Sequence, residues 1–213
     1  MNPDETQLVA KTVDPNGDII EQVLRIACYD EYRANAYYQK VIDTFGAVTP
    51  FSNIVQAEVR HYSMLESLCA KYGVQPPIND WYDKIVIGSS ILECCQDGIN
   101  AEIANIEMYD HLLPYIDAAD IRDVFYREQA ASYNNHLPAF EQCAAMQNAQ
   151  SNGFNSQQLN DMIQEMATGR FDASKLPEMF GSLFSRDLLI GAALGALAVG
   201  AFQSNLFKTD DKE

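Results

Sequence analysis

Four long segments of the chain place apolar residues at alternating intervals of four and three, the spacing that keeps one face of an α-helix apolar. The four rows lie in residues 18–45, 54–72, 91–112 and 121–143. Gly46, Gly73 and Pro114 follow the first three rows, as expected of residues that end helices. No part of these rows alternates with period two, so no strand is expected. The sequence therefore predicts an all-α chain whose centre is an antiparallel four-helix bundle with short connections.

Each row carries ionisable side chains near its middle, where an apolar residue would be expected. The rows hold, in order, Glu31, then Glu58 with His61, then Glu102, then His136. A carboxylate inside a dry bundle costs several kcal/mol unless it is paired or bound to a cation. Mid-helix positions of four bundled helices fall at one level. We therefore expect these five side chains to converge on a metal site.

The pair Glu58-x-x-His61 is the motif with the clearest chemistry. A spacing of three residues puts both side chains on one helix face, about 5 Å apart, where they can reach the same metal ion or adjacent ions. Carboxylate and imidazole ligands suit iron or manganese. A structural network of carboxylates, tyrosines and histidines without metal is the alternative interpretation.

A weak internal repeat accompanies the acids. Glu31 and Glu102 are each followed seven residues later by a tyrosine, Tyr38 and Tyr109 respectively. Two similar hairpins would explain the repeat, and so would coincidence in a chain with 11 tyrosines.

Composition excludes several function classes. The 30 acidic residues outnumber the 14 basic ones, for a net charge of -16, which disfavours nucleic acid and anionic membrane surfaces as partners. The five cysteines show no C-x-x-C spacing and lie mostly among apolar residues, as in a core kept reduced. The first 18 residues lack an apolar signal-peptide core. We expect a cytoplasmic protein.

The organisation along the chain has five parts. They are an N-terminal extension (1–18), the four-helix bundle (19–146), a polar linker with a short helix (147–181), a hydrophobic Gly/Ala-rich helix (182–207) and an acidic tail (208–213).

The hydrophobic C-terminal helix has several readings. Its uninterrupted apolar run, Leu188 to Phe202, has 15 residues, whereas a helix that spans a bilayer needs roughly 20. Gly191 and Gly195 have the spacing of closely packed helix pairs. A membrane anchor, a helix for oligomerisation or for docking into a protein shell, and a fifth bundle helix all fit these features.

The segments YDEYRANAYYQKVIDTFG, PFSNIVQAEVRHYSMLESLCAKYG, EIANIEMYDHLL and ASYNNHLPAF resemble the ferritin-like superfamily of di-iron carboxylate proteins. More narrowly, they are similar to a bacterial and archaeal ferritin-like family of unassigned function, over roughly residues 19–145. The resemblance implies that Glu31 is the terminal ligand from the first helix and Glu58 a bridging carboxylate with His61 beside it. It also implies that Glu102 is the ligand from the third helix and His136 the imidazole from the fourth.

The pattern departs from the superfamily at Tyr133, where the glutamate of a second E-x-x-H motif would stand. Glu128 lies too early in the sequence to replace that glutamate in the same motif. A tyrosine beside iron could serve as a ligand, a hydrogen-bond donor or an electron relay, so Tyr133 is a candidate catalytic residue. Its neutral side chain leaves open whether one metal or two are held.

The resemblance also implies an activity. We expect an iron-binding protein, with manganese as an alternative, that oxidises Fe(II) with oxygen or peroxide or consumes peroxide, and that forms a homo-oligomer. It would be tethered to a membrane or enclosed in a protein compartment through residues 182–207. A non-catalytic bundle that organises a membrane or compartment is the alternative function.

Overall fold

The computed structural model describes residues 3–151 and the positions 153, 157, 161, 164, 165, 168 and 170. Every regular element within residues 3–151 is a helix, which confirms the all-α prediction. The elements are α1 (Pro3–Ala10), α2 (Ile19–Phe45), α3 (Phe51–Tyr72), α4 (Trp81–Lys84), α5 (Ile91–Leu112), η1 (Leu113–Tyr115), α6 (Ala119–Ala131), η2 (Ser132–His136) and α7 (Leu137–Ser151).

The chain divides into two compact units, unit 1 (Met1–Leu137) and unit 2 (Pro138–Glu213). Unit 1 holds α1 to η2, together with every residue of the site described below. In unit 2 the structure describes α7. The hydrophobic helix and acidic tail predicted for residues 182–213 lie outside the described residues.

The ends of the long helices follow local signals in the sequence. The Asp18 carboxylate accepts a hydrogen bond from the Glu21 amide at 3.1 Å and caps the N-terminus of α2. Ser90 caps α5 in the same way through the Glu93 amide. Gly73 ends α3 in the left-handed conformation, with φ 70° and ψ 21°, which residues with a Cβ rarely adopt. These boundaries confirm the predicted limits of the rows.

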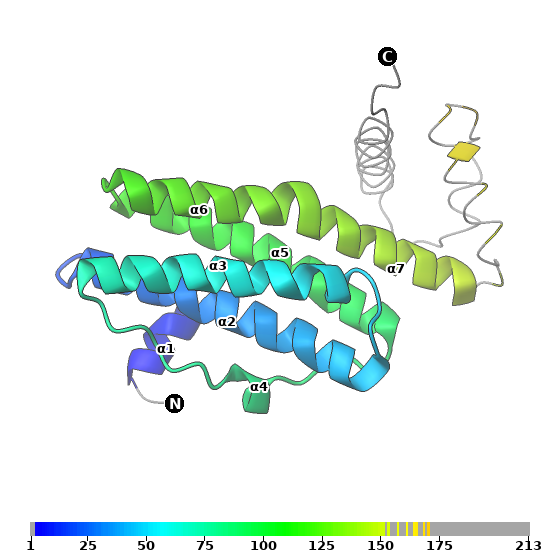
Figure 1. Cartoon of the computed structure of the whole chain (residues 1–213), viewed down its shortest axis with the longest axis horizontal. Coiled ribbons are helices and arrows are strands. Elements are labelled where there is room, and N and C mark those ends of the chain that lie inside the picture. Colours follow the sequence, from blue (N-terminus) through cyan, green and yellow to red (C-terminus); the bar gives the residue numbers. More distant parts are fainter. Residues whose placement is uncertain are drawn as a thin grey trace, which may run out of the picture. The chain divides into compact units, whose positions relative to one another are not determined.

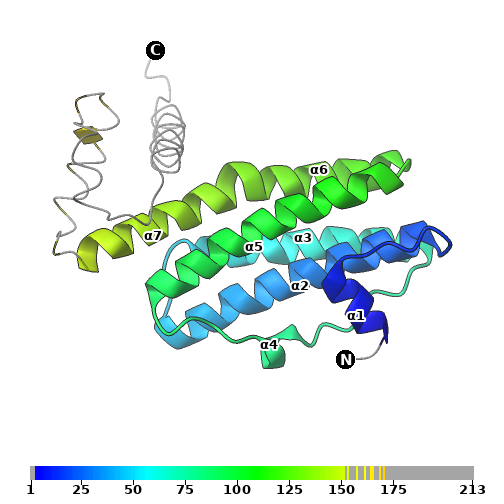
Figure 2. The ribbon, with the colours of Figure 1, turned by 180° about the vertical axis from the view of Figure 1, so that it is seen from behind.

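The helices α2, α3, α5 and α6 lie side by side in unit 1 (Figures 1 and 2). Residues 46–50 form a short link that turns the chain from α2 into α3, whereas residues 73–90, including α4, run along the length of the unit before α5 begins (Figure 1). Consequently α3 and α5 run in the same direction. The expectation of short connections between antiparallel neighbours was wrong at this point.

The N-terminal extension is part of unit 1. The side chain of Leu8 is 6% exposed and belongs to the core cluster, where Leu24, Leu65 and Phe125 are also buried. Lys11 forms an ion pair of 2.8 Å with Asp30 on α2. This segment therefore covers one end of α2.

The fourth predicted helix contains a π-helical turn, η2, between α6 and α7. The Leu137 amide donates to the Ser132 carbonyl, five residues earlier. Pro138 follows directly and has no amide hydrogen to donate. A π-turn takes up one extra residue, so the residues before and after it face the core with a shifted spacing.

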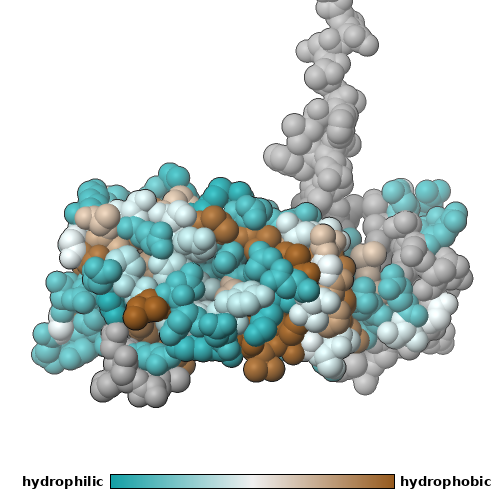
Figure 3. Space-filling view, turned by 60° about the horizontal axis from the view of Figure 1, so that its bottom comes forward, coloured by the Kyte–Doolittle hydropathy of each residue, from teal (hydrophilic) through white to brown (hydrophobic). Residues whose placement is uncertain are grey.

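The surface is mixed in character. Figure 3 shows the molecule with the bottom of Figure 1 turned toward the viewer. On this face, hydrophobic patches are interspersed among hydrophilic residues. Two strongly exposed apolar residues, Ile78 at 80% and Val86 at 86%, belong to the segment between α3 and α5. Within the described part of the chain, no helix has the length and apolar character needed to cross a membrane.

Candidate metal centre

Six ionisable side chains from α2, α3, α5, α6 and η2 meet in the interior of unit 1. We call them the carboxylate–histidine cluster: Glu31, Glu58, His61, Glu102, Glu128 and His136, none more than 8% exposed. The five residues predicted as ligands are thus brought together. Glu128 joins them, although the sequence analysis had set it aside.

The cluster contains two groups that could each hold a metal ion. One consists of Glu31, Glu58 and His61, and the other of Glu58, Glu102 and His136, with the potential ligand atoms of each group within 4.8 Å of one another. Glu58 belongs to both. Its Oε2 lies 3.2 Å from Nδ1 of His61 and its Oε1 lies 3.2 Å from Nδ1 of His136. The two oxygens of one carboxylate therefore serve two adjacent groups.

Glu128 enters the cluster from α6. Its Oε2 lies 3.1 Å from Nε2 of His61, the ring atom that faces away from Glu58. Neither oxygen of Glu128 has a hydrogen-bond partner, because the close approach to His61 lacks hydrogen-bond alignment. Burial without an aligned donor disfavours the charged form of this carboxylate, and a cation nearby would favour it.

Glu128 was not predicted, because an interval of four from Phe125 places Gln129 on the inward row. In the structure the Gln129 amide donates to Asp110 at 2.7 Å near the surface, while Glu128 is 1% exposed. A signal was present: Ile121, Phe125, Glu128 and Ser132 continue the alternation of four and three. The interval of eight positions from Glu128 to His136 then corresponds to two helical turns, because η2 takes up one residue.

Tyr133 lies elsewhere. Its side chain is 64% exposed, and it lines a surface hollow with Tyr126 and Asn134 rather than the cluster. The expected position beside a metal was therefore wrong, because the π-turn directs residue 133 outward and keeps Ser132 and His136 inward.

Two buried tyrosines hold the carboxylates of the opposite helix. Tyr109 on α5 donates to Oε1 of Glu31 at 2.8 Å, and Tyr38 on α2 donates to Oε1 of Glu102 at 2.5 Å. Burial, together with the charge of the facing carboxylate, raises the pKa of each phenol well above its usual value, so both remain donors. The seven-residue repeat in the sequence thus corresponds to a reciprocal pair of hydrogen bonds.

Asn105 extends this network on the side of Glu31. Its amide donates to Glu31 at 2.9 Å and to Asp30 at 3.1 Å, and its carbonyl accepts from the hydroxyl of Ser132 at 2.9 Å. One side chain thus ties α5 to α2 and to η2. These contacts fix the orientation of the Glu31 carboxylate.

Protons balance part of the cluster's charge. Burial raises the pKa of Glu31, but the adjacent His61 outweighs it and lowers that pKa to about 2. Burial and the charge of Glu31 raise the pKa of Glu58 to about 7 and that of Glu128 to about 8. Burial disfavours the charged imidazoles, yet their carboxylate neighbours raise the pKa of His61 to about 11 and that of His136 to about 9. At neutral pH the imidazolium protons supply positive charge that a metal ion could replace.

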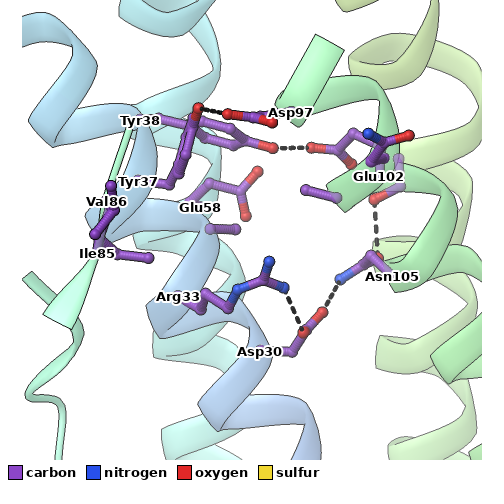
Figure 4. A pocket seen from close by; sticks show the side chains of 14 residues that line it. Asp30, Arg33, Tyr37, Tyr38, Glu58, Ile85, Val86, Asp97, Glu102 and Asn105 are labelled. Atoms are coloured by element: carbon purple, nitrogen blue, oxygen red, sulfur yellow. Dashed lines mark hydrogen bonds and ion pairs between the residues drawn. The ribbon is translucent and has the colours of Figure 1, made fainter. Parts of the chain in front are cut away.

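A cavity of about 270 Å³ leads to one side of the cluster. It reaches Glu58 and Glu102 and is lined by residues of α2, α5 and the segment before α5, among them Arg33, Tyr37 and Val86 (Figure 4). Tyr37 donates to Asp97 at 2.6 Å, and Arg33 lies 3.9 Å from Asp30. The cavity is therefore a polar passage with several carboxylates along it.

The residues present fit a pair of divalent metal ions. The three carboxylates and two imidazoles of the two groups make a donor set of oxygen and nitrogen that suits iron and manganese. The oxygens of Glu128 and Nδ1 of His136 have charged neighbours but no aligned hydrogen bond, so they are buried polar atoms that a nearby cation would help to satisfy.

The hydrogen bonds from Tyr38 to Glu102 and from Tyr109 to Glu31 should each contribute to the affinity of the cluster for metal ions. If the cluster binds a divalent metal ion, with Fe(II) as the probe, we expect Tyr38→Phe and Tyr109→Phe to weaken that binding by roughly 10- to 100-fold, the usual cost of losing a hydrogen bond to a metal ligand. Tyr109→Phe should have the smaller effect because Asn105 still donates to the same oxygen of Glu31. Anaerobic titration calorimetry measures both, with Tyr115→Phe at an exposed position as the control. Equal affinities in all three variants would contradict the prediction.

Comparison with known proteins adds no further assignment: the chain matches no family model, and it matches neither a curated protein nor a solved structure.

Proposed function

We propose that unit 1 is a ferritin-like four-helix bundle that binds two iron ions in the carboxylate–histidine cluster and oxidises Fe(II) with peroxide or oxygen. The observation that supports this most is the sharing of Glu58 between the two groups of potential ligands. A single shared carboxylate holds two cations close together while it neutralises part of the charge of each.

The roles follow from the contacts. Glu31 and His61 would complete one ion site, and Glu102 and His136 the other, with Glu58 between them. Glu128, which faces Nε2 of His61, would orient that imidazole for an ion on its Nδ1 side. Tyr38, Tyr109 and Asn105 keep the terminal carboxylates oriented, so the ligands need little rearrangement when metal binds.

The proposed reaction is a two-electron reduction of peroxide by Fe(II). Two Fe(II) ions, as the substrate, each give up one electron, and these electrons with two protons convert one peroxide molecule into two water molecules. Burial of the cluster keeps bulk water away, which strengthens the electrostatic interactions of the ligands.

The cavity supplies the passage for Fe(II) and the oxidant. Asp97 at its side and Glu58 with Glu102 at its inner end give it an acidic lining that attracts cations. Its volume of about 270 Å³ exceeds what one hydrated ion or one peroxide molecule requires. Substrates can therefore reach the half of the cluster that contains His136.

Anaerobic titration of the purified full chain with Fe(II) tests the proposed function. We expect two ions per chain, followed by rapid appearance of Fe(III) absorbance when peroxide is added. The variant Glu107→Gln, which changes an exposed carboxylate on α5, serves as a control and should bind the same number. A wild-type chain that retains no Fe(II) after desalting would refute the proposal, and the same titration with Mn(II) identifies the preferred metal.

Blocking the cavity should slow the entry of Fe(II) and peroxide without changing the number of ions that the cluster binds. We expect Ala101→Phe, which fills space at the cavity wall, to slow Fe(II) oxidation by about tenfold, or roughly 1.4 kcal/mol of activation free energy. The equilibrium number of ions should stay the same because no ligand is changed. Stopped-flow absorbance measures the rate, with Ala70→Phe at an exposed site on α3 as the matched control. Equal rates in both variants would exclude the cavity as the route.

A further inference from the structure

Two cysteines face each other in the core of unit 1. The sulfur of Cys28 on α2 lies 3.8 Å from the sulfur of Cys69 on α3, and one thiol donates a hydrogen bond to the other. Both residues are free thiols and are 0% exposed. Small buried thiols often act only as apolar side chains, but two of them in direct contact also form a potential two-electron donor.

The pair lies beside the carboxylate–histidine cluster. Cys28 precedes Glu31 by three residues on α2, a spacing that brings side chains to the same helix face about 5–6 Å apart. The charge of Glu31 contributes to the raised pKa of Cys28, after the hydrogen bond with Cys69 and burial. The dithiol therefore occupies the core layer next to one of the two groups of potential metal ligands.

The thiol contact suits oxidation of the pair. Either sulfur can donate the hydrogen bond, and the sulfur that accepts it becomes a thiolate more readily. The thiolate is the reactive form. Disulfide formation requires the two sulfurs to approach from 3.8 Å to about 2.05 Å.

We propose that Cys28 and Cys69 form an internal dithiol that gives two electrons to peroxide at the neighbouring cluster and becomes a disulfide between α2 and α3. In the net reaction both S–H bonds and the O–O bond break, and one S–S bond forms. The two electrons and two protons pass to the peroxide oxygens, which leave as two water molecules. This inference rests on the proposed function, because the peroxide that accepts the electrons is the oxidant of the neighbouring cluster.

Peptide mass spectrometry on the full chain tests the proposal. The reduced protein is loaded anaerobically with Fe(II), treated with peroxide, quenched in acid and alkylated under denaturing conditions. We expect a disulfide-linked pair of peptides containing Cys28 and Cys69, and loss of both thiols from the free-thiol count. The metal-free chain under the same peroxide exposure should keep both thiols.

Peroxide consumption provides a second measurement. Cys69→Ala should consume one molecule of peroxide fewer per chain than the wild type and should bind the same amount of Fe(II). Cys94→Ala is the matched control, because Cys94 is also a buried free thiol but contacts the Gly88 carbonyl instead of a cysteine. It should consume as much peroxide as the wild type.

The outcomes separate the two proposals. If the wild type binds and oxidises iron while Cys28 and Cys69 remain thiols, the dithiol proposal is overturned and the proposed function stands. Equal disulfide formation with and without iron would also overturn it, since the cluster would then play no part. If the chain binds no Fe(II), the preceding titration shows that the proposed function has failed, and the dithiol proposal fails with it.

Discussion

Glu58→Gln is expected to remove tight iron binding from both halves of the cluster at once. The amide has nearly the same volume, but it lacks the charge and the second acceptor oxygen that face His61 and His136. Loss of a hydrogen bond to a ligand already costs roughly 10- to 100-fold in affinity, so loss of the shared ligand should exceed about a hundredfold. Anaerobic Fe(II) titration and the rate of Fe(III) formation after peroxide measure the effect.

Comparison with single-group variants makes this result specific. Glu102→Gln changes one group and should leave the group of Glu31, Glu58 and His61 able to hold one ion. Circular dichroism of the metal-free variants checks that the helices persist. If Glu58→Gln lost no more iron than Glu102→Gln, the bridging role of Glu58 would be wrong.

Glu128→Gln is expected to impair iron binding strongly, whereas Tyr133→Phe should change it by less than about twofold. The Glu128 carboxylate is 1% exposed and faces His61, and the Tyr133 side chain is 64% exposed. As the carboxylate that faces Nε2 of the ligand His61, Glu128 should contribute the roughly 10- to 100-fold expected of a group that orients a metal ligand. Substitution of an exposed side chain away from any such feature usually has little effect.

These two variants test whether Tyr133, which the motif spacing selects, or Glu128, which the fold buries in the cluster, contributes to metal binding. Both should be measured for Fe(II) affinity and for the rate of oxidation by peroxide. Gln129→Glu, which adds a carboxylate at the neighbouring surface position, is the control for charge and should not restore binding to Glu128→Gln. A large loss in Tyr133→Phe with normal behaviour of Glu128→Gln would reverse our assignment.

The first three rows were predictable because their spacing is regular. Side chains at intervals of four and three keep to one face of a straight α-helix, and Glu58, His61 and Glu102 are buried as that spacing predicts. Burial of an unpaired acid is costly, so an acid in an apolar row already points to a partner or a cation. The convergence of the five predicted residues followed from these two arguments.

The fourth row could be predicted only in part because its helix is irregular. The extra residue in η2 shifts the spacing between α6 and His136, so a search for E-x-x-H selected residue 133. The course of residues 73–90 was also missed, since nothing in their composition distinguishes a link along the bundle from a turn at its end. Both errors concern how a segment is placed in space.

The sequence by itself determined that the chain is helical, where its long helices begin and end, and that acids and histidines stand among their core residues. These properties depend on intervals within one helix and on local capping, which short-range geometry dictates. Only the tertiary structure decided that Glu58 is shared by two groups, that Glu128 and not Tyr133 completes the cluster, and that Cys28 meets Cys69. Each of these depends on the relative rotation of helices or on one π-turn, and a rotation by a single residue exchanges buried and exposed side chains.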